Sequence, residues 1–274
     1  MEIVFDKVSY KDNENNYILK DISCKFESEK INSIIGSTGS GKTTLIKMIN
    51  FLYKPSEGTI KIDNKIISKE NINEFRRNIG LIFQFPEQQI FNKTVREELE
   101  FNLKTFNYRI NEIDKRIKDS LKIVGLSEEY LDKSPFTLSN GDMRKLALAS
   151  ILIYNPKIII LDEPTIGLDY AGKKAFIKLI KMLKNRYKKT IIIVSHDIEL
   201  IHKLTDNIIV LNEGNVVLSG NKYDVFKNRK ELKKYGIIQP NVIKFSDKVL
   251  NKKNIKLGYR DEINDLIKDI YRNV

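Results

Sequence analysis

Short apolar runs alternate with amphipathic stretches along most of the chain. Five of these runs are almost wholly apolar: residues 31–35 (INSII), 79–83 (IGLIF), 157–161 (KIIIL), 190–194 (TIIIV) and 207–211 (NIIVL). Such runs are typical of strands buried on both faces, whereas the stretches between them repeat with helical spacing. The pattern therefore predicts an α/β fold built on a mostly parallel sheet that is covered on both faces.

Two further segments differ from these five runs because they are bounded by turn residues. They are residues 2–10 (EIVFDKVSY) and 215–220 (NVVLSG). We expect both of them to be strands of an added antiparallel sheet.

The strand signal disappears between Pro86 and Pro156, where three amphipathic segments follow one another: residues 94–106, 111–124 and 141–154. These segments predict a helical insert over about residues 86–156. Thr94 followed by Glu97 fits a capping box that would start the first of the three helices.

The composition changes again from about Asn221 onward. Residues 227–236 (KNRKELKKYG) and 261–274 (DEINDLIKDIYRNV) predict helical pieces around a break at Pro240. We therefore divide the chain into a main domain, residues 1–226, and a C-terminal helical extension, residues 227–274.

Composition narrows the class of protein. A chain of 274 residues that is 41% hydrophobic and 31% charged can bury a sizeable core. Cys24 is its only cysteine, which excludes an intrachain disulfide and a thiolate metal cage. No apolar run approaches the roughly 20 residues that span a bilayer, so we expect any membrane to be contacted from outside.

The formal net charge of +12 is unevenly distributed. From Gly220 onward, 14 Lys and Arg stand against 7 Asp and Glu. A basic balance of this size is compatible with nucleic-acid binding, but a solvated, lysine-rich surface is the simpler interpretation.

A phosphate-binding loop is predicted directly after the first buried run. The stretch GSTGSGKTT comprises Gly36, Ser37, Thr38, Gly39, Ser40, Gly41, Lys42, Thr43 and Thr44. Its glycines allow backbone N–H groups to turn toward phosphate oxygens, and the following helix adds the positive end of its dipole. Lys42 is expected to reach the β- and γ-phosphates of ATP, and the Thr43 hydroxyl to bind Mg²⁺.

Polar residues end two other buried runs, where a parallel sheet presents its ligand-binding groups. Asp162 ends the run 157–161 and would support Mg²⁺, and Glu163 would orient or deprotonate the attacking water. His196 follows the run 190–194, at the place expected for a γ-phosphate sensor. Gln84 ends the strand IGLIFQ, and the other histidine, His202, is expected to be a packing or surface residue.

These motifs stand in the order found in ATP-binding-cassette (ABC) ATPases, which the chain resembles over about residues 1–226. They are GSTGSGKTT, Gln84, LSNGD (138–142), IIILDEPT (158–165), IGLD (166–169) and the Ser-His pair 195–196. The resemblance implies a two-lobed cassette that works as a dimer, with each ATP between one subunit's phosphate loop and the other's signature, here Ser139, Asn140, Gly141 and Asp142. It also implies that Gln84 serves Mg²⁺ and hydrolysis and that Asp169 lies at the subunit interface.

Three stretches resemble, more narrowly, the ATPases of energy-coupling-factor (ECF) transporters: residues 80–101, 143–172 and 233–245. This resemblance implies a peripheral ATPase on the cytoplasmic face of the membrane. Its partners would be a second cassette, a transmembrane coupling protein and membrane proteins that capture a vitamin or metal ion. We expect Phe85, Pro86 and Phe91 to form the apolar face that docks on the membrane partner.

The signature departs from the family pattern Leu-Ser-Gly-Gly-Gln at two positions, because Asn140 replaces glycine and Asp142 replaces glutamine. Ser139 and Asp142 still fit the start of a helix that is aimed at an anion. A carboxylate near the γ-phosphate weakens nucleotide closure unless it is screened. We therefore expect this signature to support hydrolysis less well in the partner's site, without abolishing it. We also expect a heterodimer, because a homodimer would carry the weaker signature twice.

The resemblance also implies that an aromatic residue near the end of the first strand stacks on adenine. Tyr10, near the end of the first strand, is the better candidate, but a shift of two residues puts Asp12 there. Three other functions stay open: the cassette of another importer with two dedicated permeases, a mainly regulatory nucleotide switch, and a cassette that acts on nucleic acid. We expect no nucleic-acid partner, because the docking stretch around Phe85 favours a membrane protein.

Overall fold

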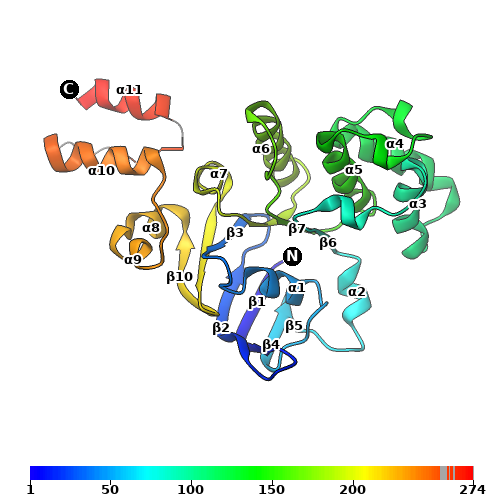
Figure 1. Cartoon of the computed structure of the whole chain (residues 1–274), viewed down its shortest axis with the longest axis horizontal. Helices are drawn as coiled ribbons and strands as arrows, with labels where there is room; N and C mark the ends of the chain where they lie inside the picture. The colour runs from blue at the N-terminus through cyan, green and yellow to red at the C-terminus, as the bar shows by residue number, and fades with distance from the viewer. Residues whose placement is uncertain (254–257, 259, 262, 274) are drawn as a thin grey trace.

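The computed structural model describes residues 1–253, 258, 260–261 and 263–273. Two sheets occupy the centre of the molecule, a group of helices lies at one end of its longest axis, and the C-terminal helices lie at the other end (Figure 1). Among these residues, every helix is either too short or too polar to cross a bilayer.

The larger sheet has six strands in the order β10-β9-β3-β8-β7-β6. Their bounds are Ile31–Gly36 for β3, Ile79–Ile82 for β6, Ile158–Asp162 for β7, Thr190–Val194 for β8, Asn207–Asn212 for β9 and Asn215–Asn221 for β10. Strands β3, β6, β7, β8 and β9 are parallel, which confirms the predicted α/β sheet. Parallel strands end at a common edge, so the loops that follow β3, β6, β7 and β8 lie near one another.

The prediction that residues 215–220 belong to the added antiparallel sheet is wrong. Strand β10 pairs antiparallel with β9 at the edge of the larger sheet. Glu213 and Gly214 join the two strands with positive φ angles of 48° and 76°. Because this tight turn sends the chain straight back along β9, the hairpin decides which sheet β10 joins.

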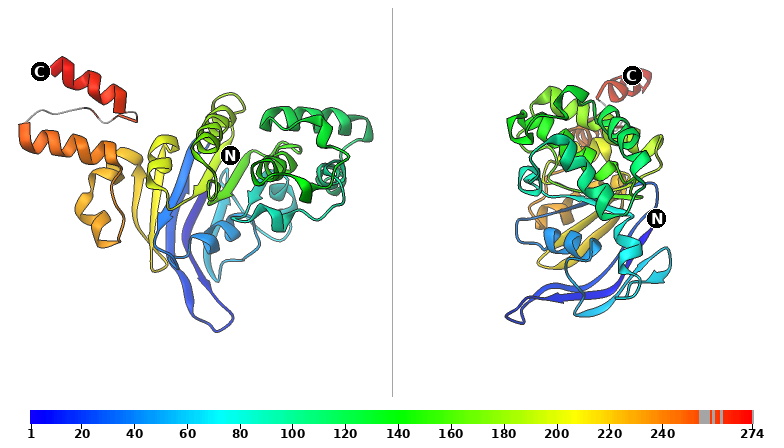
Figure 2. Two further views of the ribbon diagram at one scale, coloured as in Figure 1. Left: turned by 45° about the horizontal axis from the view of Figure 1, so that its top comes forward. Right: turned by 90° about the vertical axis from the view of Figure 1, so that its right-hand side faces the viewer.

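The smaller sheet is antiparallel, in the order β2-β1-β4-β5. Its strands are Ile3–Lys11 (β1), Tyr17–Phe26 (β2), Glu57–Ile62 (β4) and Lys65–Ile66 (β5). The predicted strand at residues 2–10 is confirmed as β1. Figure 2 shows the β1–β2 hairpin projecting away from the rest of the chain.

Alternate residues of the parallel strands enter two separate cores. Ile159 of β7 packs in the core that contains helices α6 (Tyr170–Asn185) and α7 (Ile198–Leu204). Ile160 packs in the other core with α1 (Lys42–Ile49), α2 (Ile72–Arg76) and the smaller sheet. Both faces are therefore covered, which is why the strand sequences are almost wholly apolar.

The helical insert is confirmed. It contains α3 (Val95–Thr105), α4 (Ile110–Val124), α5 (Asn140–Leu152) and the short 3₁₀ helices η1 (Pro86–Gln89), η2 (Glu128–Tyr130) and η3 (Pro135–Thr137). The Thr94 hydroxyl accepts a hydrogen bond from the Glu97 backbone N–H at 3.2 Å, as the capping pattern predicts. In a capping box the Glu97 carboxylate would accept the Thr94 backbone N–H. Here it accepts the N–H of Lys93, the preceding residue, instead.

The C-terminal part is helical: α8 (Lys222–Lys227), α9 (Arg229–Lys234), α10 (Asn241–Lys253) and α11 (Ile263–Asn273). Helices α9 and α11 correspond to the two predicted pieces, although residues 262 and 274 of the second piece lie outside the described residues. The sequence analysis did not predict α10, which begins directly after Pro240. Leu232 and Ile243 of the extension are buried in the same core as Phe226.

Candidate nucleotide-binding and hydrolysis site

The phosphate-binding loop lies at the carboxyl end of β3 and leads into α1, as predicted. Gly36 and Gly41 have φ angles of 156° and 99°. A Cβ atom on Gly36 would lie 2.2 Å from the Leu211 carbonyl oxygen, and one on Gly41 would lie 2.6 Å from the Leu19 side chain. A side chain at either position would therefore force the loop away from its neighbours.

The Ser40 hydroxyl shows that this loop fits a phosphate group. The side chain is only 2% exposed, and its oxygen has no hydrogen-bond partner in the described structure. Buried polar groups are almost always paired. A phosphate oxygen held by the loop would supply the missing acceptor, so the residues present fit a bound nucleotide.

Lys42 is folded back onto the loop that precedes it. Its ammonium group donates to the carbonyl oxygens of Gly36 at 3.0 Å and Ser37 at 2.7 Å. Burial lowers the pKa of Lys42, and the carboxylates of Glu163 and Asp162 oppose this shift. Phosphate binding would replace these two contacts to neutral carbonyl oxygens by contacts to anionic oxygens, which attract the ammonium group more strongly.

Thr43 and Asp162 form the candidate magnesium position. The Thr43 hydroxyl donates to Oδ2 of Asp162 at 3.5 Å, a long hydrogen bond. Burial, and next the neighbouring Glu163 charge, raise the pKa of Asp162 to about 6. A divalent cation would stabilise the ionised form of this carboxylate. Within the described ranges, no cluster of three or more His, Cys, Asp or Glu side chains could hold a metal. The Thr43 hydroxyl and the Asp162 carboxylate would supply two oxygen ligands to Mg²⁺.

Glu163 is fixed at the end of β7 by groups that follow β8. Its Oε1 atom lies 2.8 Å from Nδ1 of His196 and accepts the His196 backbone N–H at 3.0 Å. Its Oε2 atom accepts the Ser195 hydroxyl at 3.1 Å. Glu163 has a φ of 47°, a strained value for a residue with a side chain. The structure thus brings together Glu163 and His196, two of the three residues predicted to serve hydrolysis.

The sequence analysis missed the role of Ser195. This hydroxyl is fully buried and also accepts the Asp197 backbone N–H at 3.1 Å, so it ties Glu163 to the start of α7. The available signal was its position, because Ser195 directly follows a buried strand and directly precedes His196.

Gln84 does not end a strand, because β6 stops at Ile82. Gln89 explains the early ending: its carbonyl oxygen accepts the Phe83 N–H at 2.9 Å and its amide donates to the Leu81 carbonyl at 3.3 Å. The register pairs Ile82 with Leu161, so Gln84 follows β6 at the edge where Asp162 follows Leu161. The sequence analysis did not identify Gln89 as the residue that holds this loop.

The altered signature begins helix α5. The Ser139 hydroxyl accepts the Asp142 backbone N–H at 3.2 Å and donates to the Asp142 carboxylate at 2.8 Å. The Lys145 ammonium group lies 2.9 Å from the same carboxylate. The hydrogen bond from Lys145 lowers the pKa of Asp142, and the one from Ser139 contributes less. The carboxylate is therefore screened within its own helix, and Asn140 and Gly141 form the first turn.

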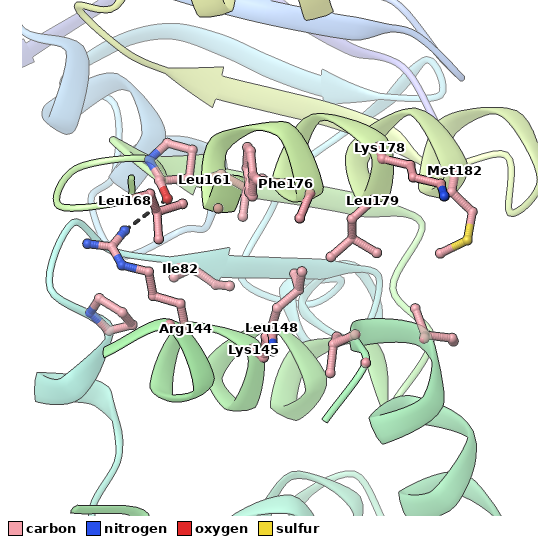
Figure 3. Close-up of a pocket in the computed structure, with 18 of the residues that line it drawn as sticks. Ile82, Arg144, Lys145, Leu148, Leu161, Leu168, Phe176, Lys178, Leu179 and Met182 are labelled. Carbon is pink, nitrogen blue, oxygen red and sulfur yellow. Dashed lines mark hydrogen bonds between the residues drawn. The ribbon is translucent and has the colours of Figure 1, made fainter. Parts of the chain in front are cut away.

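An apolar groove of about 490 Å³ separates α5 of the insert from α6 of the main lobe (Figure 3). Leu148, Phe176 and Leu179 contribute to its walls. Arg144 bridges it by donating to the Pro164 carbonyl at 2.9 Å, the bond drawn as a dashed line in Figure 3. The insert is therefore divided from the main lobe by a groove over part of their boundary.

Asp169 starts helix α6, because its carboxylate accepts the Gly172 backbone N–H at 2.7 Å. This cap is a structural role that sequence reasoning did not assign. The predicted position of Asp169 at a subunit interface is not tested by a single chain.

Tyr10 stacks on Tyr53, with ring centroids 4.9 Å apart and an angle of 8° between the rings. One face of the Tyr10 ring is therefore covered by protein. Asp12 accepts the backbone N–H groups of Glu14 and Asn16 at 2.9 Å and so shapes the β1–β2 turn. Tyr17 of β2, which the sequence analysis did not single out, is 43% exposed and carries the Lys11 ammonium 4.4 Å from its ring centroid.

Two groups of predicted residues emerge from this geometry. The phosphate loop, Asp162, Glu163 and His196 share one edge of the larger sheet. Ser139 and Asp142 belong to the insert, and across residues 1–253 no hydrogen bond or ion pair joins them to the phosphate loop. The residues expected to serve hydrolysis and those of the expected signature therefore form two separate groups in this chain.

The family model described as "ABC transporter" matches residues 19–166, more than half of the chain. The model described as "AAA domain, putative AbiEii toxin, Type IV TA system" matches residues 132–202 only. The "Energy-coupling factor transporter ATP-binding protein EcfA2" of Caldanaerobacter subterraneus subsp. tengcongensis is 41% identical over 88% of this chain and 87% of its own length. The protein of the same name from Clostridium perfringens is 40% identical over 85% of this chain and 83% of its own length.

Solved structures agree with these relatives. A cbiO1 from Clostridium perfringens, described as part of the ABC transporter complex cbiONQ, superposes with a TM-score of 0.77 at 33% identity, over 92% of this chain and 98% of that one. The cassette MJ0796, described as a dimer bound to ADP and Pi in a post-hydrolysis state, gives 0.71 at 32% identity, over 80% of this chain and 98% of its own. The chain therefore belongs to the ABC transporter family, as an ATP-hydrolysing cassette of the energy-coupling-factor kind.

Proposed function

We propose that this chain is the ATPase subunit that powers an energy-coupling-factor importer from the cytoplasmic face of a membrane. One observation carries the proposal: Glu163 is held by His196 and Ser195 at the sheet edge where the phosphate loop ends. A carboxylate held in this way suits a water-activating group beside a phosphoryl group. The relatives named EcfA2 supply the transport context.

In the proposed reaction the oxygen of a water molecule attacks the γ-phosphorus atom of ATP. The bond from phosphorus to the bridging oxygen breaks, and ADP and inorganic phosphate leave. Glu163 accepts the proton from the water, and His196 orients the carboxylate through its Nδ1 atom. Lys42 turns from the Gly36 and Ser37 carbonyls to the phosphates. Thr43, Asp162 and Gln84 would hold Mg²⁺, which neutralises charge on the phosphate oxygens when it is bound.

A second cassette completes each nucleotide site in this proposal. Helix α5 begins at Asn140, and Ser139 is its N-cap residue. The backbone N–H groups of the first turn point outward along the helix axis. Such a helix start suits the γ-phosphate of a nucleotide bound by another subunit. The partner is proposed to be a related but different cassette, because two copies of this altered signature would weaken both sites.

The membrane partner is proposed to dock in a groove of about 310 Å³ between the two lobes. We call it the docking groove, and its rim includes Leu52, Phe91 and Phe101, which are 51%, 62% and 43% exposed. Phe91 and Phe101 contact each other edge to face, with centroids 4.9 Å apart. Exposed aromatic side chains of this kind suit the apolar side of a partner helix.

The prediction that Phe85, Pro86 and Phe91 form a docking face is wrong for Pro86. Pro86 is buried and lines the groove between α5 and α6, whereas Phe85 is 46% exposed. Glu98 supports the remaining face, because its buried carboxylate accepts the backbone N–H groups of Phe91 and Asn92 at 3.2 and 3.1 Å. The two partly buried hydrogen bonds of Gln89 connect the same loop to β6.

The test is gentle affinity purification of the chain from its native membranes, with identification of the bound proteins. We expect a second cassette, one coupling protein and several small membrane proteins. Phe91→Asp should remove the membrane proteins, and Ile66→Asp, which adds the same charge to an exposed apolar position on β5, should keep them. Recovery of two dedicated permeases would reject the shared coupling protein, and equal recovery with both variants would reject the docking groove.

A further inference from the structure

The C-terminal extension contains a cavity that neither hydrolysis nor docking uses. It has a volume of about 400 Å³ and lies between α9 and α10. We call it the basic pocket. Its lining comprises Arg229, Lys233, Ile237, Ile238, Gln239, Lys244, Asp247 and Lys248. Helices α9 and α10 lie at the end of the molecule opposite the helical insert (Figure 1).

Four cations face this pocket as two pairs. Arg229 and Lys233 are separated by four residues on α9, and Lys244 and Lys248 by four residues on α10. Like charges at this helical spacing repel each other, and the two pairs face each other across one cavity. In the described part of the chain, no ion pair satisfies any of these four side chains. The folded chain therefore brings together four positive charges without compensating them.

The carboxylates nearby do not remove this surplus. Asp247 lines the pocket, and its Oδ2 atom accepts the Gln239 amide at 3.3 Å. Gln239 is itself 5% exposed and donates to the Phe226 carbonyl at 2.6 Å, so this corner of the pocket is rigid. Glu231 of α9 pairs with Lys234 at 2.7 Å and is not among the lining residues. One carboxylate thus stands against four cations.

We propose that the basic pocket binds a small anion that carries two or more phosphate groups. Several phosphate oxygens can accept hydrogen bonds from both helices at once, whereas a single carboxylate cannot span two facing pairs of cations. Ile238, which is 64% exposed, and Ile237 offer an apolar wall for the remainder of such a ligand. A volume of about 400 Å³ lies within the usual range of small-molecule sites. The anion is a soluble phosphorylated compound or the headgroup of a phospholipid.

The pocket is connected to the hydrolytic site through helix α7 and three hydrogen bonds. The backbone N–H of Asn241, the first residue of α10, donates to the Glu199 carboxylate of α7 at 2.8 Å. Helix α7 is capped by Asp197, whose N–H donates to Ser195, and Ser195 in turn donates to Glu163. An anion that draws α9 and α10 together would therefore act on α7, whose N-cap Asp197 directly follows His196. The binding site itself does not depend on the transport role.

The test measures binding of inorganic pyrophosphate to the full-length chain by calorimetry at low salt. All variants carry Lys42→Ala, so that the phosphate loop does not compete. Lys233→Gln with Lys244→Gln removes two charges from the basic pocket. Lys230→Gln with Lys252→Gln removes two exposed charges from the same two helices outside it and is the matched control. We expect the pocket variant to bind about tenfold or more weakly and the control within about twofold.

A parallel arm identifies the source of the phosphate. The same variants are sedimented with vesicles that contain cardiolipin, whose headgroup carries two phosphates, and, separately, with vesicles of phosphatidylcholine. Loss of pyrophosphate binding in the pocket variant alone supports a soluble ligand, and loss of cardiolipin binding in that variant alone supports a headgroup. The proposal is overturned if the pocket variant loses neither kind of binding, or if the pocket and control variants are weakened equally. It is also overturned if the pocket variant binds pyrophosphate normally but no longer copurifies with the second cassette, because the pocket is then a protein contact.

Discussion

The Lys145 ammonium group lies 2.9 Å from the carboxylate of Asp142, three residues earlier in α5. Asp142 stands where the family signature has glutamine, and its charge would otherwise face the partner's γ-phosphate. Lys145 screens that charge, so the altered signature keeps a helix start that suits an anion. We expect Lys145→Met to lower ATPase activity of the two-cassette complex about three- to tenfold, which corresponds to about 1 kcal/mol.

A double variant separates screening from packing. In an Asp142→Gln chain the same Lys145→Met change should cost less than about twofold, because no carboxylate is left to screen. Lys118→Met is a control for the loss of one exposed cation from the insert. If Lys145→Met costs the same with and without Asp142, the ion pair has no role in the signature.

Glu163 should be indispensable for hydrolysis and dispensable for binding. We expect Glu163→Gln to reduce ATPase activity at least about 100-fold with little change in ATP affinity, because the amide cannot accept the proton of water. Ser195→Ala should reduce activity less, by about three- to tenfold, since it frees only one carboxylate oxygen. Single-turnover hydrolysis and equilibrium nucleotide binding are the measurements.

The proposed heterodimer makes a further prediction about Glu163. If this chain's signature is weaker than its partner's, Glu163→Gln here and the matching change in the partner should cause unequal losses. In the proposed dimer this chain's own site would use the partner's signature and is expected to contribute more turnover. Equal losses would contradict the asymmetry.

His202 should make the chain less stable in mild acid. The ring is fully buried, neither nitrogen has a partner in the described residues, and burial, with Lys222 next, lowers its pKa. The other charged groups around it are Lys203, Glu199 and Asp261. The unfolded chain protonates this histidine near pH 6.5, whereas the folded chain resists. Stability is therefore fully present above pH 6.5 and is lost as the pH falls toward the folded pKa.

His202→Phe should flatten this dependence between pH 7.5 and 5.5. The variant should also be about 1 kcal/mol more stable at pH 7.5, because two unpaired buried nitrogens are replaced by a ring that packs on Phe226. Thermal unfolding across the pH range is the measurement. His196, the only other histidine in the chain, is exposed. The control His196→Gln should therefore leave the pH dependence of the unfolding temperature unchanged.

Tyr10 and Tyr17 differ in how they could meet adenine. Tyr53 covers one face of Tyr10, whereas Tyr17 is 43% exposed and precedes Ile18, whose carbonyl oxygen lies 3.3 Å from where a Cβ on Gly41 would be. If Tyr10 stacks on the base, Tyr10→Ala should weaken ATP binding about tenfold and leave pyrophosphate binding unchanged. Tyr17→Ala is the comparison, and a larger loss there would transfer the stacking role to Tyr17.

Sequence alone determined that the larger sheet is built on parallel strands, and it determined the positions of the candidate site residues along the chain. Apolar runs buried on both faces are typical of parallel strands. A glycine-rich loop between such a strand and a helix is typical of a phosphate-binding loop. Ser139 and Thr94 were likewise predictable as caps, because capping depends on residues within one turn.

Tertiary structure decided everything that depends on residues distant in sequence. It placed β10 on the larger sheet, ended β6 early through Gln89, buried Pro86, and joined Glu163 to residues that follow a different strand. It also brought Arg229 and Lys233 opposite Lys244 and Lys248. Local patterns cannot specify these contacts, because each depends on how separate elements pack, and the packing free energy is shared across the whole core.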